Sequence, residues 1–512
     1  MSQLNVSRRA FIRGGMALSL APAWFPGPAA AAFDPNFGDA VDAARAIRAG
    51  RISSRELTEY CFARIARLNP AINAFVTLNE EAALLRARAA DEALARGAPW
   101  GALHGVPIVM KDLRMTAGLR TTFGSKRYEN FVPSDNDVVM QRLLDAGVVL
   151  LGKTNTPEFG ADHQTFNAVA GTTNNPWDFS RSPGGSTGGG AAALACGLGF
   201  LELGNDLGGS VRNPAHFCGV YGHKPSFDLV PRDGPRLPDA VLATPDNQWV
   251  NGPLARSARD LQFALDLVAG PAGDTALAYR LAAPKPRATR LKDFRLGFVL
   301  SDPFCPTSAE VRVLLERLIE RLGSAGVALQ KGWPAGFDLQ ETSDNWFFLA
   351  VNSWFARDED IRKRVDSLRE VDDYYVRKIV EALPASYHQW RLRDGGRLKA
   401  RSMWQDYFRD VDAFLMPVQF CAAFPHVQNK NVWERFIPTP EGPRMYLEIG
   451  RWGSVAIYSG LPASVAPIGR TGGGLPVGVQ ILGPFLEDST AIQVAALLED
   501  VVGGFAPPPS AQ

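Results

Sequence analysis

Two segments dense in glycine constrain this chain more than any other feature. The first is SPGGSTGGGAAA at residues 182–193, and the second is GNDLGGSVRNPAHFCG at residues 204–219. A flexible linker separates domains, whereas apolar stretches typical of helix or strand follow both segments within a few residues. We therefore predict that these glycines allow backbone segments to pack closely at one site.

The first segment also contains the pattern G-x-S-x-G, through Gly184, Ser186 and Gly188. In α/β-hydrolases this pattern presents a serine nucleophile on a turn that is entered from a strand. The preceding residues, GTTNNPWDFSRSP, hold two prolines and several Asn, Asp and Ser residues, which indicate a loop. The sequence also indicates no His–Asp pair for Ser186, so an α/β-hydrolase triad is not expected.

A second pattern, GVVLLGKT at residues 147–154, matches the phosphate-binding loop G-x-x-x-x-G-K-[ST]. Such a loop needs a strand before its first glycine and a helix after the pattern. Here the four residues between the glycines are Val, Val, Leu and Leu, which themselves read as a strand, and NTPEFG follows. Nucleotide binding is therefore not expected.

The second glycine-dense segment has the composition of an oxyanion hole. Gly208 and Gly209 precede Ser210, so successive backbone N–H groups can converge on one point. Asp206 and Arg212 bracket this turn, and we predict an ion pair between them. A serine nucleophile also needs a base. Lys111 ends the apolar run LHGVPIVMK, where burial would lower its pKa toward neutrality, although a surface lysine at a strand end fits the spacing equally well.

Composition excludes several classes of function. Of the 512 residues, 46% are hydrophobic and 21% charged, the formal net charge is +1, and no basic stripe indicates a nucleic-acid partner. Five scattered cysteines without C-x-x-C spacing, and histidines without H-E-x-x-H spacing, indicate neither a disulfide framework nor a metal site. Outside the first 32 residues, no apolar run approaches the roughly 18 residues of a spanning helix, so membrane insertion is not expected.

The residue composition and periodicity change along the chain. Residues 33–100 are rich in Ala, Arg, Glu and Leu and predict two or three helices, broken at RLNPAINAF. Residues 101–270 alternate short apolar runs with helical stretches, which predicts an α/β fold. A strand–helix–strand unit is predicted from DFRLGFVL to GVALQ, with a capping box formed by Thr307 and Glu310.

Residues 341–452 hold six of the eleven tryptophans. Most such aromatic residues belong to a core, but their density also suggests a helical insert that lines an apolar substrate pocket.

The first 32 residues resemble a targeting segment. The twin arginines Arg8 and Arg9, with Phe11 two positions on, precede a short apolar stretch and a small-residue region near Ala29. We expect a twin-arginine export signal, read by the twin-arginine export machinery, and a periplasmic or extracellular protein. The alternative is an ordinary basic N-terminus that precedes a core helix.

Several segments together resemble the amidase signature family of serine hydrolases. They are the lysine segment LHGVPIVMKD, the two serine segments SPGGSTGGGAAALACG and GNDLGGSVRNPAHFCGVYGHKPS, and the later markers NGPLARSARDL, DAFLMPV and SGLPASVAPIGRTGGGLPVGVQILG. The likeness extends from about residue 37 to residue 500. It implies one domain over residues 33–512 with the amidase signature fold, a large mixed β-sheet covered by α-helices on both faces.

The resemblance also implies a Ser–cisSer–Lys triad. Ser210 would be the nucleophile, and Lys111 would be the base and later the acid. Ser186, held by a cis peptide bond, would relay the proton between them. The amides of Leu207, Gly208, Gly209 and Ser210 would form the oxyanion hole.

Departures from the family pattern are small. Thr187 stands where a second serine is common and keeps a hydroxyl that can support Lys111. Asn205 replaces a frequent threonine before Asp206, and Ser226 replaces another. None of these changes removes a catalytic atom, so an active enzyme is expected.

The function implied is hydrolysis of a carboxylic amide through a seryl acyl-enzyme, without cofactor or metal, by a monomer or homodimer. An apolar or aryl amide is the expected substrate, with esters and carbamates as further candidates, because the signature itself does not specify the substrate. Two alternatives stay open. One is a glutaminase-like subunit of a tRNA-dependent amidotransferase, which would be cytoplasmic and need partner subunits. The other is a non-catalytic binding protein on the same scaffold.

Overall fold

Two β-sheets position the predicted site residues. The computed structural model describes residues 33–232, 247–355, 359–428 and 431–512, so the predicted export signal lies outside the described residues. The smaller sheet has the strand order β1-β3-β2, and the larger has the order β10-β9-β11-β15-β14-β7-β8-β6. Their strands are β1 Phe75–Leu78, β2 Pro107–Lys111, β3 Val149–Thr154, β6 Glu202–Asp206, β7 Tyr221–Lys224, β8 Val250–Ala255, β9 Arg295–Phe298, β10 Ala328–Lys331, β11 Ala413–Pro417, β14 Ala463–Arg470 and β15 Pro476–Leu482.

The larger sheet is mixed, as the family resemblance implies. Strands β9, β10 and β11 are parallel, whereas the pairs from β11 through β15, β14, β7 and β8 to β6 are antiparallel. Two short hairpins lie outside it, formed by β4 Phe166–Asn167 with β5 Gly171–Thr172 and by β12 Phe436–Thr439 with β13 Gly442–Met445.

The two sheets meet where β2 runs beside the start of β6. The amide of Val109 donates to the carbonyl of Leu201 at 3.0 Å, and the amide of Phe200 donates to the carbonyl of Pro107 at 3.1 Å. The ends of β2 and β6 are therefore neighbours, which brings Lys111 next to the second glycine-dense segment.

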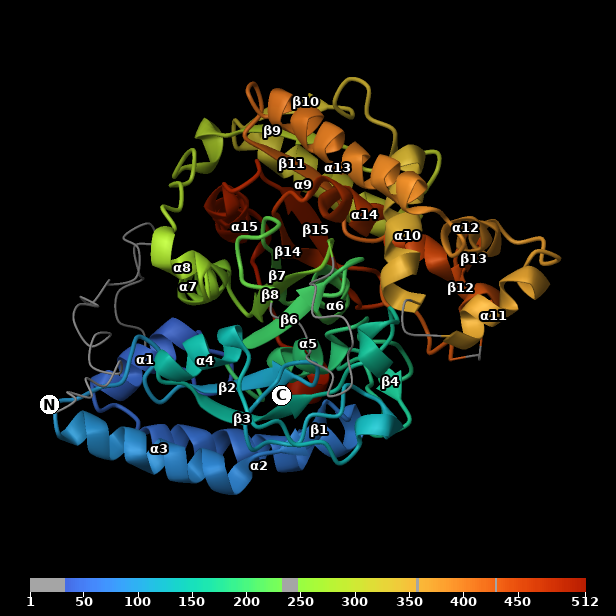
Figure 1. Ribbon diagram of the computed structural model, residues 1–512. Helices are drawn as coiled ribbons and strands as arrows, with labels where there is room; N and C mark the ends of the chain where they lie inside the picture. Colours follow the sequence, from blue (N-terminus) through green and yellow to red (C-terminus); the bar gives the residue numbers. More distant parts are fainter. Residues whose placement is uncertain (1–32, 233–246, 356–358, 429–430) are drawn as a thin grey trace, which may run out of the picture. The chain divides into compact units, whose positions relative to one another are not determined.

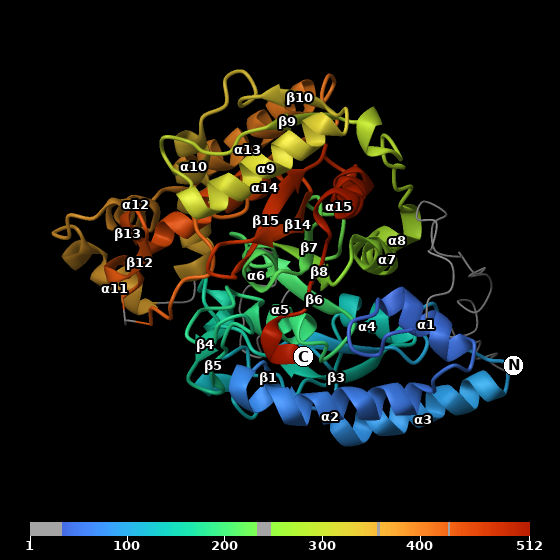
Figure 2. The same ribbon diagram turned by 180° about the vertical axis from the view of Figure 1, so that it is seen from behind.

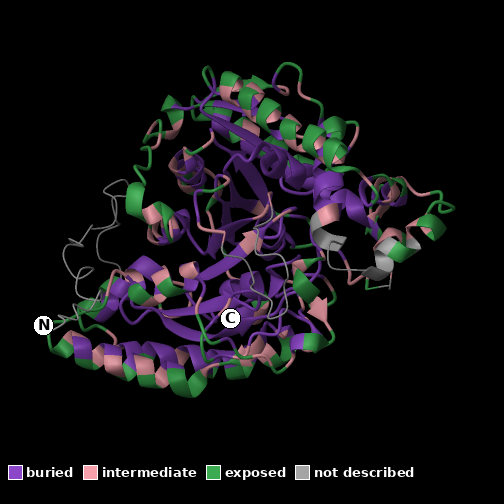
Figure 3. Ribbon diagram, viewed as in Figure 1, coloured by how far each residue is buried: buried purple, intermediate pink, exposed green. Residues whose placement is uncertain are grey.

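Helices cover both faces of the larger sheet (Figures 1 and 2). In both views α6 and α15 flank β14 and β15 from opposite sides. The helices are α1 Ala40–Arg48, α2 Ser54–Ile72, α3 Glu80–Ala95, α4 Val138–Asp145, α5 Gly188–Ala195, α6 Arg212–Cys218, α7 Ala258–Val268, α8 Thr275–Ala278, α9 Ala309–Ser324, α10 Leu339–Phe355, α11 Glu359–Leu368, α12 Tyr374–Ala382, α13 Tyr387–Tyr407, α14 Gly450–Ser459 and α15 Asp488–Val502. Figure 3 shows that α5, α6 and the central strands are buried.

Three N-terminal helices, α1 to α3, lie where the sequence predicted two or three helices. α2 begins with a capping box between Ser53 and Glu56 and continues through Pro70 to Ile72. The break predicted within RLNPAINAF lies at Asn73, near the end of that segment, where the backbone is left-handed. The short strand β1 follows, and its pairing with β3 could not be read from its four residues.

The predicted strand–helix–strand unit is β9–α9–β10, with the two strands parallel. The predicted capping box was wrong. The N-cap is Ser308 and makes no side-chain cap, while the amide of Ala309 donates to Glu441 Oε1 at 2.8 Å. A carboxylate from the β12–β13 turn thus satisfies an amide of the first turn, and a distant residue of this kind cannot be read from local sequence.

The aromatic-rich residues 341–452 contain α10 to α13 and the start of α14. Trp404 and Trp452 are fully buried and pack with Trp333, and Trp404 also packs with Phe414 of β11. These tryptophans belong to the core. None of the helices that the structure describes is both long and apolar enough to cross a membrane.

Candidate active site

Lys111 is the last residue of β2 and is completely buried. Its Nζ lies 2.6 Å from Ser186 Oγ, 3.0 Å from Thr187 Oγ1 and 2.9 Å from Asn205 Oδ1. The alternative of a surface lysine is therefore excluded. The amine lies among three oxygens, two of which belong to hydroxyl groups that can exchange protons with it.

Burial lowers the pKa of Lys111 to about 7, although the carboxylates of Glu202 and Asp206 act in the opposite direction. The cause is the loss of water around the ammonium group, which disfavours the charged form. A substantial fraction of the amine is then neutral near pH 7 and can accept a proton.

Ser186 occupies a tightly packed backbone. The peptide bond between Gly185 and Ser186 is cis, and Gly184 has a φ of 83°. A Cβ atom on Gly185 would lie 2.6 Å from the carbonyl carbon of His163, so only glycine fits there. The glycines before Ser186 therefore permit the close approach of two loops that their sequence predicted.

Ser210 lies at the more open end of the group. Its exposed fraction is 7%, whereas Ser186 is completely buried. The amide of Thr187 donates to the carbonyl of Ser210 at 3.1 Å, which holds the two serine segments side by side. Among the described residues, no direct hydrogen bond joins the hydroxyls of Ser186 and Ser210. Lys111 and Ser186 are thus joined by a hydrogen bond, and Ser210 lies in the neighbouring segment.

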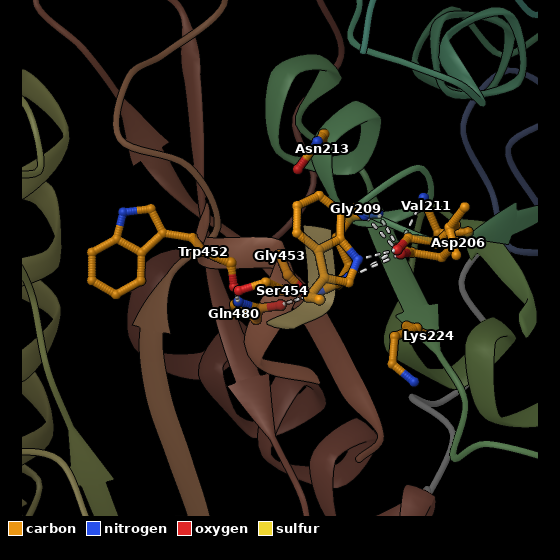
Figure 4. Close-up of polar contacts among 12 residues, drawn as sticks. Asp206, Gly209, Val211, Asn213, Lys224, Trp452, Gly453, Ser454 and Gln480 are labelled. Carbon is orange, nitrogen blue, oxygen red and sulfur yellow. Dashed lines mark hydrogen bonds and ion pairs between the residues drawn. The ribbon is translucent and has the colours of Figure 1, made fainter. Parts of the chain in front are cut away.

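The oxyanion turn, residues 207–210, is held by Asp206. This carboxylate accepts from the amide of Gly209 at 2.7 Å and from the amide of Val211 at 3.1 Å (Figure 4). It also pairs with Arg212 at 2.8 Å. Burial opposes its ionisation, but Arg212 and the Gly209 amide outweigh burial and lower the pKa of Asp206 to about 2. The predicted ion pair is thus present and buried.

This geometry corrects one predicted oxyanion donor. The amide of Gly209 already donates to the Asp206 carboxylate, so it is not free to donate to an oxyanion in this geometry. Within the described part of the chain, the amides of Leu207, Gly208 and Ser210 donate to no protein acceptor. The other three predicted donors, the amides of Leu207, Gly208 and Ser210, stay a prediction.

Three residues near the site carry roles that the sequence did not assign. Asn205 provides the third oxygen to the Lys111 amine, although it was noted only as a departure from the family pattern. Glu202, one strand away, accepts from the hydroxyl of Thr154 at 2.9 Å, and burial raises its pKa to about 7. Trp346 of α10 donates to the carbonyl of Leu207.

The described residues contain no group of three His, Cys, Asp or Glu side chains that could hold a metal ion. All five cysteines are free and buried, and burial raises the pKa of Cys61, Cys196 and Cys305 to about 12. These thiols are therefore poor nucleophiles at neutral pH.

A cavity of about 620 Å³ lies near the β14–β15 turn, between Trp177, Leu314 and Arg470. It is lined by none of the triad residues. The predicted lining of a substrate pocket by residues 341–452 stays a prediction.

Comparison with known proteins assigns the family. The Amidase family model matches residues 56–492. The chain belongs to the amidase signature family. It is therefore a hydrolase of the amidase type, and its mixed sheet with flanking helices is the amidase signature fold.

The relatives differ in what they act on. The chain is 34% identical over 474 residues to a glutamyl-tRNA(Gln) amidotransferase subunit from Thermus thermophilus, covering 88% of this chain and 94% of that protein. The solved structure of 6-aminohexanoate cyclic dimer hydrolase with its substrate matches with a TM-score of 0.74 at 26% identity, over 93% and 99% of the two chains. A bacterial aryl acylamidase of the amidase signature family, at 23% identity, shares the fold with a TM-score of 0.76 over 91% and 96%.

Proposed function

We propose that this chain hydrolyses a carboxylic amide through an acyl-enzyme on Ser210, with Lys111 as the base and Ser186 as the proton relay. The single observation that carries the proposal is the 2.6 Å contact between the buried Lys111 amine and Ser186 Oγ, in the segment bonded to the backbone of Ser210. The lowered pKa of Lys111 supports the same assignment, since the amine is partly neutral at pH 7.

In the acylation step, Ser210 Oγ attacks the carbonyl carbon and transfers its proton to Ser186, whose own proton passes to Lys111. The new oxyanion lies against the amides of the oxyanion turn, and each such donor is worth about 10²–10³ in rate. The C–N bond then breaks, and the Lys111 ammonium returns a proton through Ser186 to the leaving nitrogen. Water completes the cycle with the same base, which releases the carboxylic acid and Ser210.

The test of this proposal is covalent labelling with a serine-reactive fluorophosphonate. We expect the label on the peptide that contains Ser210, no label in Ser210→Ala, and slower labelling in Lys111→Ala. A label on another residue, or none, would contradict the proposal.

The role of an amidotransferase subunit is a second candidate, because that relative is matched over 94% of its length. Such a protein would release ammonia from glutamine for partner subunits. We propose the free-standing hydrolase instead, supported by the twin arginines, which a cytoplasmic subunit does not need. Glutamine hydrolysis that rises on adding purified amidotransferase partner subunits would reverse this choice.

An apolar or aryl amide is the proposed substrate class, with esters and carbamates as further candidates. The solved relatives include a cyclic-amide hydrolase and an aryl acylamidase, so the family accommodates both kinds of substrate. A panel of aryl, aliphatic, cyclic and peptide amides with matched esters and carbamates tests the proposal. Preference for peptide amides over all apolar ones would contradict it.

We also propose export by the twin-arginine route to the periplasm or beyond. Its support is the pair Arg8 and Arg9 with Phe11, and the five free, buried cysteines are compatible with it. Fractionation of cells that express the full chain and an Arg8→Lys, Arg9→Lys variant tests it. Equal amounts of both proteins outside the cytoplasm would contradict it.

A further inference from the structure

We infer that Trp346 is a positioning residue for the oxyanion turn, and that it sets the direction of the Gly208 amide. This inference rests on the proposed function. It gives one aromatic residue of the 341–452 region a role in catalysis that is distinct from lining a substrate pocket.

The contact is a hydrogen bond across 139 positions of sequence. Trp346 Nε1 donates to the carbonyl oxygen of Leu207 at 2.8 Å, and the side chain of Trp346 is 1% exposed. In a trans peptide unit the C=O and the following N–H point in opposite directions. A bond that holds the Leu207 carbonyl therefore also holds the N–H of Gly208 on the opposite side of that peptide.

Two glycines make the space for the indole. A Cβ atom on Gly208 would lie 2.7 Å from Cζ2 of Trp346, and one on Gly450 would lie 2.5 Å from Cη2. The six-membered ring thus lies directly against the backbone of the oxyanion turn and that of α14. Any larger residue at either position would displace the ring or the turn.

α14 also approaches the turn through Gly453, one helical turn after Gly450. A Cβ atom on Gly453 would lie 2.9 Å from the carbonyl oxygen of Gly208. The carbonyl of Gly453 in turn accepts from Arg212, the partner of Asp206. The turn is therefore packed against Asp206, α10 and α14, and Arg212 links Asp206 to α14.

Different side chains hold different peptide groups of the turn, and this explains why Trp346 is needed. Asp206 holds the amides of Gly209 and Val211 but not that of Gly208. The peptide between Leu207 and Gly208 is held through its carbonyl by Trp346. Removing the indole N–H leaves this peptide free to rotate, which turns a donor away from the developing oxyanion.

The chain offers a matched control. Trp452 of α14 is also fully buried, and its Nε1 has no hydrogen-bond partner among the described residues. Figure 4 shows its ring turned away from Asp206 and Gly209. Trp346→Phe and Trp452→Phe thus make the same change of ring, but only the first removes a hydrogen bond to the oxyanion turn.

The experiment compares kcat, KM and the affinity of phenylboronic acid, which forms a tetrahedral anion on an active serine. Because an indirect contact supports one donor of the oxyanion hole, Trp346→Phe should lower kcat by about 10- to 100-fold, with KM changed by less than about threefold. Phenylboronic acid affinity should fall by the same factor as kcat/KM, and the acid limb of the pH profile should stay unchanged. Trp452→Phe should leave all of these values near wild type.

Equal kcat and boronic acid affinity in the two variants would overturn the inference. If Trp346→Phe does not fold, 3-benzothienylalanine at position 346 keeps the ring shape without the N–H, and the same two outcomes apply. A wild-type enzyme that is not labelled at Ser210 would instead contradict the proposed function, so the two failures are distinguishable.

Discussion

Two buried lysines on neighbouring strands show what would make one of them a base. Lys111 ends β2, and Lys153 lies on β3, where it pairs with Met110. Both side chains are completely buried. Lys153 donates to the carbonyl of Arg114 and to the hydroxyls of Thr116 and Thr121, whereas Lys111 contacts Ser186, Thr187 and Asn205.

Burial lowers the pKa of both lysines, to about 7 for Lys111 and to about 8 for Lys153. The carboxylates of Asp112 and Asp137 act against burial at Lys153, because they favour its charged form. Burial and a shifted pKa therefore do not distinguish them. The difference lies in the partners, because only Lys111 contacts a hydroxyl beside a possible nucleophile. Lys153 instead binds a loop to β3.

The largest expected effect comes from replacing each lysine with methionine. Lys111→Met should lower kcat/KM by at least about 10⁴-fold, as loss of a triad member does in other serine hydrolases, while the protein still unfolds cooperatively. Lys153→Met should instead lower the free energy of unfolding by about 1–3 kcal/mol, because buried acceptors lose their donor. Steady-state kinetics and thermal melts on both variants measure this. Similar kinetic losses in the two folded variants would remove the distinction.

A smaller effect is expected from replacing a hydroxyl residue that contacts each lysine, Ser186 for Lys111 and Thr121 for Lys153. Ser186→Ala should slow acylation by about 10³-fold, because it interrupts proton transfer from Ser210 to Lys111. Thr121→Val removes a hydroxyl from Lys153 in the same way but should leave the acylation rate near wild type. Stopped-flow measurement of the acylation burst compares them. A Ser186→Ala enzyme that acylates at the wild-type rate would exclude the relay.

The smallest expected effect is a shift of the pH profile. The Glu202 carboxylate raises the pKa of Lys111, so Glu202→Gln should move the acid limb of kcat/KM to lower pH. Asp112→Asn, which removes a carboxylate near Lys153, is the control and should leave the limb in place. A shift to higher pH in Glu202→Gln would contradict the electrostatic account of Lys111.

Much of this site could be predicted from the sequence because its residues lie in short segments with strong local patterns. Lys111 ends the apolar strand β2, Asp206 ends the strand before the second glycine-dense segment, and the glycines around Ser186 and Ser210 indicated close packing. What could not be predicted depends on contacts between distant segments. Examples are the bond from Trp346 to Leu207 and that from the Ala309 amide to Glu441, because neither partner carries a local signal.

The oxyanion turn shows a second kind of feature that could not be predicted from the sequence. Four successive amides were predicted to converge, but the Asp206 carboxylate takes that of Gly209. The sequence placed Asp206 beside the turn as a partner of Arg212 only. Which amides a short carboxylate reaches depends on the dihedral angles of the turn, and composition does not determine these.

The central claim is that Ser210 is acylated with neutral Lys111 as the base, and the rate of fluorophosphonate labelling as a function of pH tests it most directly. A lysine with a lowered pKa is neutral above about 7 and protonated below it. The rate of labelling at Ser210 should therefore rise with pH through an apparent pKa near 7 and fall steeply toward pH 5, and Lys111→Met should lose this dependence. A labelling rate that stays flat from pH 9 to about 5 would contradict a lysine base.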